Sequence, residues 1–264
     1  MPSPLENDHI DIWLLPIEGW NFTNLEGRQL NQLLSEKEQC RFQRFRPPRK
    51  KTEFIASRLL LRHLLSTYTE CDVLNTEAVP DGMGRPFWFE NNRATDLFFS
   101  LSHTKNMVCC ALSRHQEIGC DIESLQPRKY LQELAERVFS EQEHNYYQQL
   151  PLQSQSEFFY RSWTLKEAFI KALGQGLRIP LTSLSFTYMA HLGKTFVVSP
   201  KQLGSNWTSR PYFFQSCQPT PGYSLGIATP IKAASINIID AQLTTGNSIR
   251  AMKRADSQSH NLPS

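Results

Sequence analysis

Two carboxylates stand two positions apart in the segment 118–123, Ile-Gly-Cys-Asp-Ile-Glu. Successive side chains of a β-strand point to opposite faces, so a strand here places Asp121 and Glu123 together on one face. Like charges this close repel one another unless a cation lies between them, and paired carboxylate oxygens suit Mg²⁺. The pattern indicates a divalent-cation site, although a half-exposed strand with an acidic solvent face has the same spacing.

A second set of reactive side chains follows a helical spacing. Trp163, Glu167 and Lys171 lie four residues apart and therefore share one helix face. A helical Glu–Lys pair by itself is most often a surface ion pair that contributes roughly a few tenths of a kcal/mol. Trp163 favours a partly buried face, on which Glu167 could add a third carboxylate to Asp121 and Glu123 while Lys171 neutralises a phosphate.

A serine and a histidine are adjacent in Ser100-Leu101-Ser102-His103-Thr104. We expect a polar turn here, between buried strands at 97–101 and 107–112. Neighbouring residues of a turn rarely form the serine–histidine pair of a hydrolase, which also needs a third orienting group. The segment is either simple turn chemistry or an anion cradle made of hydroxyl, imidazole and backbone amides.

Positive charge is concentrated in one stretch, although the whole chain of 264 residues has a formal net charge of only +3. Concentrated cations of this kind attract phosphates or an acidic protein surface, and a solvated helix face is the alternative. The only acid among them is Glu53. The eight cations are Arg41, Arg44, Arg46, Arg49, Lys50, Lys51, Arg58 and Arg62.

Composition places the chain among globular proteins. It is 40% hydrophobic and 11% aromatic, and no apolar run approaches the roughly 20 residues of a membrane span. The N-terminus lacks the charged and apolar regions of a signal peptide, and the six cysteines have no CxxC spacing. We therefore expect a cytoplasmic protein with no membrane or nucleic-acid partner and no disulfide framework.

The elements that must position these residues can be outlined from patterning. Residues 9–16 alternate as an opening strand, and a helix is expected from about residue 50 to 67. The Ser-x-x-Glu pattern at Ser35, Ser140 and Ser154 predicts three capping boxes, the last opening a helix that runs to Leu173. Both halves thus have an α+β layout with a seam near Ser113–Glu117, and ligand sites favour such seams.

Taken in chain order, the motifs resemble the Sfp-type 4′-phosphopantetheinyl transferases over roughly residues 34–184. The first is a basic stretch that begins with Arg-Phe-Gln-Arg-Phe at 41–45 and ends in Ser-Arg-Leu-Leu-Leu-Arg at 57–62. The other four are Gly-Arg-Pro at 84–86, Phe-Ser-Leu-Ser-His-Thr at 99–104, Ile-Gly-Cys-Asp-Ile-Glu at 118–123, and Phe-Tyr-Arg-Ser-Trp-Thr-Leu-Lys-Glu-Ala-Phe-Ile-Lys-Ala-Leu-Gly-Gln-Gly-Leu at 159–177. One acidic motif is weak evidence, whereas five motifs in order are specific.

The resemblance implies a fold and an activity. The fold is a pseudo-dimer of two similar α/β subdomains, with the active site in the cleft between them. Residues 1–116 would form the coenzyme A-binding subdomain, residues 117–243 the metal and catalytic subdomain, and residues 244–264 a flexible tail. The activity is transfer of the phosphopantetheine arm of coenzyme A to a serine of an apo acyl or peptidyl carrier protein, with release of adenosine 3′,5′-bisphosphate.

The resemblance also implies roles for individual residues. The metal ligands, for Mg²⁺ or alternatively Mn²⁺, would be Asp121, Glu123 and Glu167; Glu167 would also be the general base, and Lys171 would contact the diphosphate. Further coenzyme A contacts would be Arg41, Arg85, Pro86, Ser102, His103 and Lys166. Arginine at 41 and 85 keeps the charge of the usual lysine but changes the hydrogen-bond geometry. Carrier proteins of this type are acidic, and a monomer is expected.

Two other functions fit some of these residues. A magnesium-dependent nuclease or phosphodiesterase could use Asp121, Glu123 and Glu167, but such sites commonly place a lysine two residues beyond the strand carboxylate, where this chain has Leu125. A non-enzymatic binder of acidic proteins or RNA would explain the basic stretch and leave the carboxylates without a role.

Overall fold

The computed structural model describes residues 5–6, 8–24, 27–70, 77–80, 86–90, 93–114, 116–174, 176–186, 196–198, 210–231, 235–252 and 260–261. Its α-helices are α1 (Gly27–Leu33), α2 (Glu36–Arg44), α3 (Pro48–Tyr68), α4 (Leu131–Val138), α5 (Glu141–Gln149) and α6 (Leu152–Leu173), with short 3₁₀ turns at Gly176–Arg178 and Leu181–Ser183. No described helix combines the length and apolarity that crossing a bilayer requires.

The strands form three sheets. The first has the order β12-β11-β1-β6-β5, with β13 also pairing with β11; the second has the order β7-β10-β9-β8; the third is β2-β3-β4. Their bounds are β1 His9–Pro16, β2 Glu77–Pro80, β3 Pro86–Glu90, β4 Arg93–Ala94, β5 Leu97–Thr104, β6 Met107–Arg114, β7 Gly119–Ser124, β8 Phe196–Val198, β9 Tyr212–Cys217, β10 Tyr223–Thr229, β11 Ser235–Leu243, β12 Ile249–Met252 and β13 His260–Asn261.

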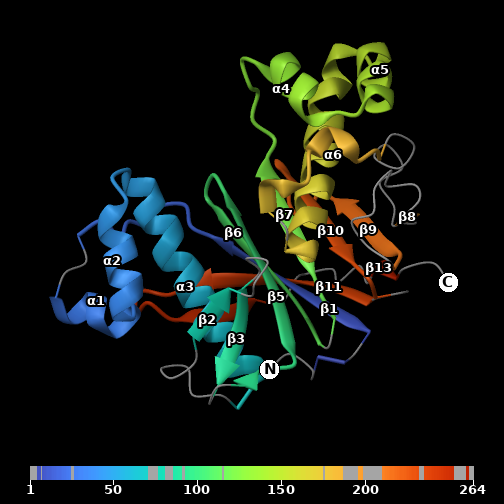
Figure 1. The fold of residues 1–264 in the computed structure, drawn as a ribbon. Coiled ribbons are helices and arrows are strands. Elements are labelled where there is room, and N and C mark those ends of the chain that lie inside the picture. The colour runs from blue at the N-terminus through green and yellow to red at the C-terminus, as the bar shows by residue number, and fades with distance from the viewer. Residues whose placement is uncertain are drawn as a thin grey trace.

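The two larger sheets pack in layers between α3 and α6 (Figure 1). Alternation in β1 sends Trp13 and Leu15 toward α3, while Ile12 and Leu14 pack with β7 and β10 on the opposite face. On its outer face the second sheet packs against α6 through a separate apolar cluster that includes Phe169. The chain is therefore a mixed α+β protein whose second sheet lies between the first sheet and α6.

Several sequence expectations for the elements are confirmed. The opening strand spans His9–Pro16, and the capping boxes at Ser35 and Ser140 are both formed. The expectation at Ser154 is wrong. α6 begins two residues earlier, at Leu152 after Pro151, because proline presets the backbone at a helix start.

The C-terminal region also differs from expectation. Residues 244–252 are not a loose tail, because Ile249–Met252 forms β12 and pairs antiparallel with Asp240–Leu243 across a turn in which Asn247 has φ 57°. Strand β11, expected with residues 117–243 in the second subdomain, instead pairs in parallel with β1 in the first sheet. The apolar alternation of β11 slips at Ile238 and Ile239, and alternation within one strand does not identify the distant strand with which it pairs.

Candidate active site

β7 carries Asp121 and Glu123 on the face that meets α6. The apolar residues that alternate with them, Cys120 and Ile122, point into the core between the two sheets, as the alternation predicts. Gly119 shares the face of the carboxylates, and a β-carbon there would overlap the backbone of α6. Glycine at this position therefore lets α6 approach the strand closely enough to bring its side chains to Asp121.

Two side chains of α6 reach this strand. The Lys171 ammonium donates to Asp121 Oδ1 at 2.7 Å and to the Cys120 carbonyl at 3.1 Å. Glu167, one turn earlier, interacts electrostatically with Asp121, Lys171 and Glu123. The structure thus brings together the three carboxylates and the lysine that the sequence analysis selected.

The three carboxylates repel one another electrostatically. Burial and the neighbouring Asp121 raise the pKa of both Glu123 and Glu167 above the ordinary glutamate value. Burial alone would lower the pKa of the Lys171 ammonium, but the charge and hydrogen bond of Asp121, together with Cys120 and Glu167, outweigh it, so this pKa is raised. Lys171 and Arg128 are the two cations beside these three acids, so the site is short of positive charge.

The donor set fits a divalent cation. Asp121 Oδ2 is buried and has no hydrogen-bond partner among the residues that the structure describes, although the second oxygen of the same carboxylate has two. A buried oxygen without a partner is costly unless a ligand satisfies it. The residues that would hold a cation here are Asp121, Glu123 and Glu167, whose oxygens are hard ligands suited to Mg²⁺ or Mn²⁺.

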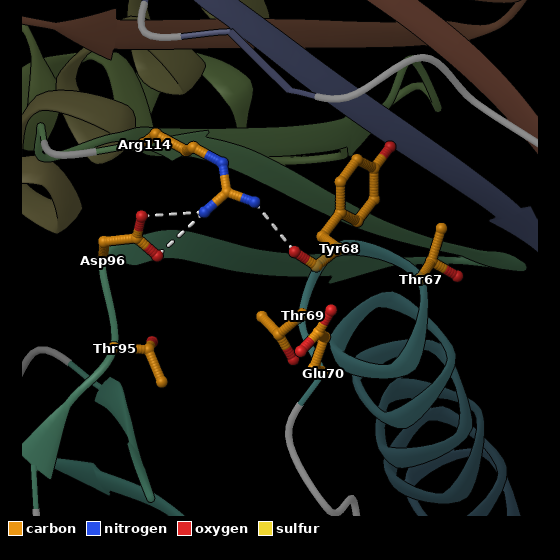
Figure 2. A pocket seen from close by; sticks show the side chains of 7 residues that line it. All are labelled: Thr67, Tyr68, Thr69, Glu70, Thr95, Asp96 and Arg114. Carbon is orange, nitrogen blue, oxygen red and sulfur yellow. Dashed lines mark hydrogen bonds and ion pairs between the residues drawn. The ribbon is translucent and has the colours of Figure 1, made fainter.

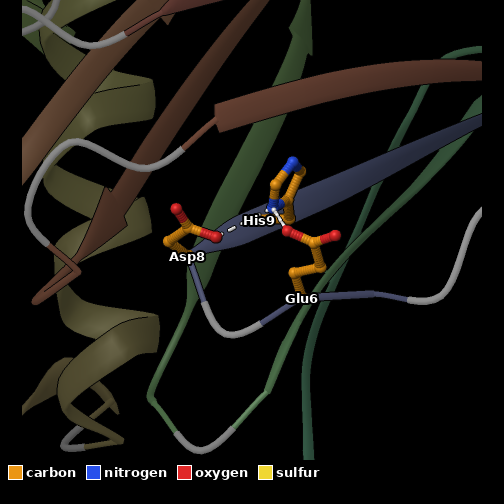
Figure 3. Close-up of side chains that lie close together, drawn as sticks. All are labelled: Glu6, Asp8 and His9. Atoms are coloured by element: carbon orange, nitrogen blue, oxygen red, sulfur yellow. Dashed lines mark hydrogen bonds and ion pairs between the residues drawn. The ribbon is translucent and has the colours of Figure 1, made fainter.

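The oxygens of Asp121, Glu123 and Glu167 are not all close to one another in this structure. Within the described residues, ligand atoms of three acidic, histidine or cysteine side chains lie within 4.8 Å of one another only at Glu6, Asp8 and His9. Figure 3 shows His9 between the two acids at the start of β1, with Nδ1 2.9 Å from Asp8 Oδ1. That group lies at the surface, where the imidazole already contacts both acids.

Ser102 does not lie in a turn. β5 continues to Thr104 and the connection to β6 is only Lys105–Asn106, with Asn106 at φ 61°. Asparagine accepts that backbone conformation more readily than most residues, which allows a tighter hairpin than expected. Ser102 is buried and donates to Asp121 Oδ1 at 2.7 Å, so the structure joins it to the carboxylates.

His103 points to the opposite face of β5, toward α3. Its Nδ1 lies 3.5 Å from Glu53 Oε2, and 40% of its side chain is exposed. Glu53 is buried and also binds Arg49 at 2.6 Å and Lys50 at 2.9 Å. Burial lowers the pKa of His103 and Glu53 only partly opposes this, whereas the bonds to Lys50 and Arg49 outweigh burial and lower the pKa of Glu53.

Lys166 lies apart from these residues. Its ammonium is fully buried and donates to Glu143 at 2.5 Å and to the carbonyls of Val138 and Leu181 at 2.6 and 2.9 Å. An ammonium has three protons, so this set occupies all of them. The geometry directs Lys166 into the packing of α4 and α5 on α6 and away from Lys171.

The remaining expected coenzyme A contacts are Arg41, Arg85 and Pro86. Arg41 is exposed on α2, with its guanidinium 5.7 Å from the centre of the Phe54 ring. Pro86 begins β3 and pairs with Pro80 of β2, and Arg85 lies outside the described residues.

A polar cavity of about 610 Å³ opens at the opposite end of β5. Figure 2 shows Arg114 at its wall, donating to Asp96 and to the Tyr68 carbonyl. The other lining residues are Thr67, Thr69, Glu70 and Thr95. None of the residues selected from sequence lines it, so the cavity is separate from the carboxylate site.

Three residues that the geometry brings to these sites were not selected from the sequence. Thr104 donates to Glu123, Glu53 binds His103, and Gly226 of β10 sits where a β-carbon would overlap the α6 backbone. Two signals were present in the sequence: the period-two hydroxyls of Ser-x-Ser-x-Thr, and the single acid within the basic stretch.

Comparison with known proteins decides the family. Residues 117–228 match a model described as the 4′-phosphopantetheinyl transferase superfamily, and residues 18–115 match one described as the N-terminal part of a 4′-phosphopantetheinyl transferase. The 4′-phosphopantetheinyl transferase HetI of Nostoc sp. is 31% identical over 181 residues, which cover 67% of this chain and 75% of the relative. The chain belongs to the 4′-phosphopantetheinyl transferase superfamily.

Other relatives carry the same description. The 4′-phosphopantetheinyl transferase Sfp of Bacillus subtilis is 27% identical over 213 residues, covering 76% of this chain and 89% of the relative. The 4′-phosphopantetheinyl transferase AcpT of Escherichia coli O157:H7 is 35% identical over 143 residues, covering 54% and 68% respectively. The resemblance drawn from the motifs is thus confirmed, and the chain is a phosphopantetheinyl transferase enzyme rather than a nuclease or a simple binding module.

Proposed function

We propose that this transferase moves the 4′-phosphopantetheine group of coenzyme A to a serine of an apo acyl or peptidyl carrier protein, with Mg²⁺ or Mn²⁺ held by Asp121, Glu123 and Glu167. The observation that carries this proposal is the buried, unpartnered Oδ2 of Asp121 beside two glutamates of raised pKa. A bound cation would neutralise the diphosphate and make its phosphorus more electrophilic.

Glu167 is the proposed general base. A serine hydroxyl is a weak nucleophile until a base removes its proton, and the raised pKa makes Glu167 a better proton acceptor than an ordinary glutamate. The serine oxygen attacks the phosphorus that carries pantetheine and forms a new P–O bond. The bond from that phosphorus to the bridging oxygen breaks, and adenosine 3′,5′-bisphosphate leaves with the bonding electrons.

Lys171 is the proposed diphosphate contact. Its side chain is 30% exposed, and its ammonium lies on the Asp121 carboxylate, where it can also meet a phosphate oxygen. Its raised pKa keeps it charged at neutral pH, so it can offset the charge that develops on the leaving phosphate. Lys166 is left out of the proposed contacts because all three of its donors are occupied elsewhere.

The nucleotide end of coenzyme A is proposed to lie toward α3. His103 is half exposed beside Glu53, and the two cations that bind Glu53, Lys50 and Arg49, leave a net positive charge there for a 3′-phosphate. Arg41, Arg85 and Pro86 complete the proposed contacts. Ser102 is not a direct phosphate ligand in this proposal, since its hydroxyl is buried and already bonded to Asp121.

The proposed overall arrangement is a pseudo-dimer with coenzyme A in a cleft between residues 1–116 and the unit that starts at 117. Its support is that edge strand β5 of the first sheet meets edge strand β7 of the second beside the carboxylates. We propose a cytoplasmic monomer whose acidic carrier partner is attracted by the basic stretch. Four of those eight cations bind Glu53 or Glu38, and exposed Arg44 and Arg46 add to the remaining charge.

The experiment that tests this function combines the protein, coenzyme A, Mg²⁺ and several apo carrier proteins. Mass spectrometry of the carrier should show one added phosphopantetheine, and omission of the cation or addition of EDTA should prevent it. Failure to modify any acyl or peptidyl carrier would overturn the proposed substrate, and transfer that persists in EDTA would overturn the cation site.

A further inference from the structure

Three hydroxyls on β5 connect the two sheets. Ser100, Ser102 and Thr104 lie on the same face of the strand because they are two residues apart. Their oxygens accept the backbone N–H groups of Cys120, Ile122 and Ser124 at 3.0, 3.3 and 3.2 Å. Both β5 and β7 are edge strands, so these side chains satisfy amides that no neighbouring strand of the second sheet reaches.

Two of these hydroxyls make a second bond. Ser102 donates to Asp121 Oδ1 at 2.7 Å, and Thr104 donates to Glu123 Oε2 at 3.1 Å. A backbone N–H can only donate, so the hydroxyl oxygen accepts that bond. The single proton of the hydroxyl then donates to the carboxylate oxygen. Each hydroxyl therefore ties the carboxylate of β7 to the backbone of the residue that follows it.

In each carboxylate, the oxygen that accepts from the hydroxyl also accepts from a basic side chain. Lys171 donates to Asp121 Oδ1 at 2.7 Å, and Arg128 donates to Glu123 Oε2 at 3.4 Å. Within the part of the chain that the structure describes, no donor meets Asp121 Oδ2 or Glu123 Oε1. In both carboxylates one oxygen has two donors and the other has none.

We propose that Ser102 and Thr104 are positioning residues that make Asp121 and Glu123 bind a divalent cation through one oxygen each, Oδ2 and Oε1. This inference rests on the proposed cation site. Ca²⁺ often takes both oxygens of a carboxylate, whereas Mg²⁺ demands six ligands in near-octahedral geometry and retains several waters. In each carboxylate a hydroxyl and a basic side chain occupy the second oxygen, so one oxygen is left for the metal ion. Binding through one oxygen of each carboxylate favours Mg²⁺ and Mn²⁺ over Ca²⁺.

The test uses Mn²⁺ binding by the full chain, without coenzyme A, followed by electron paramagnetic resonance. Thr104→Val keeps the shape of the side chain and removes the hydroxyl, and we expect it to weaken Mn²⁺ binding about 10-fold or more. Thr104→Ser restores the hydroxyl and should remain within about 3-fold of the wild type. Thr67→Val is the matched control, because among the described residues the Thr67 hydroxyl bonds only within α3, to the His63 carbonyl.

Competition separates positioning from simple stability. Mg²⁺ should displace Mn²⁺ from the wild type at a lower concentration than Ca²⁺ does. In Thr104→Val the displacing concentrations of Mg²⁺ and Ca²⁺ should be closer to each other. If the wild type binds Mn²⁺ and Thr104→Val binds it equally well, the positioning role is wrong while the proposed function stands. If the wild type binds no Mn²⁺, both the cation site and this inference fall. Thermal melting identifies any variant that fails to fold.

Discussion

Two lysines five residues apart on α6 have opposite surroundings. Lys166 is fully buried, and its partner Glu143 is satisfied at both oxygens by Lys166, by the Ser140 backbone amide and by the Phe186 backbone amide. The partner of Lys171 is Asp121, of which one oxygen has two donors and the other, though buried, has none.

The difference separates a structural ion pair from a binding site. Around Lys166 every donor and acceptor is matched, so the cluster holds α5 against α6 and has nothing left for a ligand. Around Lys171 the carboxylates outnumber the cations, and burial and mutual repulsion raise the pKa of Glu123 and Glu167. Functional sites often retain such unbalanced charge, whereas structural clusters remove it.

The largest expected effect comes from the unbalanced cluster, which consists of Lys171 with Asp121, Glu123 and Glu167. Glu167→Gln removes the proposed base and a cation ligand, so we expect transfer to fall by about 10²–10⁴-fold. Stability should be maintained or rise, because one of three repelling charges is lost. Mass spectrometry of the carrier gives the rate, and thermal unfolding without cation gives the stability. Near-wild-type turnover in this variant would show that the assignment of Glu167 is wrong.

The balanced cluster, which consists of Lys166, Glu143 and the backbone groups that bind them, should behave in the opposite way. Glu143→Gln leaves the buried Lys166 ammonium without its counter-charge, and loss of one partner of a buried pair lowers the free energy of unfolding by about 3–5 kcal/mol. The transfer rate per folded molecule should change little. Lys171→Met is the matched variant, in which the rate should fall far more than the stability. Denaturant unfolding measures both proteins, and a stable Glu143→Gln chain with no activity would break the comparison.

Sequence alone predicts much of the unbalanced cluster. Strand alternation places Asp121 beside Glu123, and helical spacing places Glu167 beside Lys171, because both periodicities are local properties of the backbone. The contact between the strand and the helix is not local. It depends on the close approach of α6 at Gly119 and Gly226, and single glycines in a sequence do not identify what they approach.

The balanced cluster is harder to predict. Lys166 and Lys171 belong to the same motif, and the sequence analysis assigned both to the coenzyme. Helical phase does turn Lys166 away from Glu167 by about 100°. The burial of Lys166, however, requires α4, α5 and the 3₁₀ turn at Leu181–Ser183 to fold over it. The contact of Ser102 with Asp121 is similarly hard to predict, since it depends on the meeting of two edge strands that are separate in sequence.

A smaller effect is expected at the α3 side of the site. If His103 binds the 3′-phosphate, His103→Ala should raise the KM for coenzyme A about 10-fold or more, as for loss of a hydrogen bond to a charged group. The KM for 3′-dephospho-coenzyme A should change less than about 3-fold. Steady-state kinetics with both substrates distinguishes this contact from a general effect on the fold. Equal weakening of the two substrates counts against it.

The smallest expected effect is a pH-dependent stabilisation by the cation. The folded-state pKa values of Glu123 and Glu167 are raised above 4.5, so the stability they contribute is present at low pH and is lost as pH rises through those raised values. Ionisation creates the repulsion that a divalent cation relieves. Mg²⁺ should therefore raise the melting temperature by about a few degrees at pH 8 and by less at pH 5.

Glu143→Gln and Glu123→Gln turn this last measurement into a test of the two clusters. Glu123→Gln should diminish the Mg²⁺-dependent shift at pH 8 while making the chain without cation more stable at that pH. Glu143→Gln should lower the melting temperature and leave the Mg²⁺-dependent shift in place, because the cluster around Lys166 has no open oxygen for a cation. A shift that is equal at pH 5 and pH 8, or that persists in full in Glu123→Gln, would place the cation somewhere other than beside Asp121.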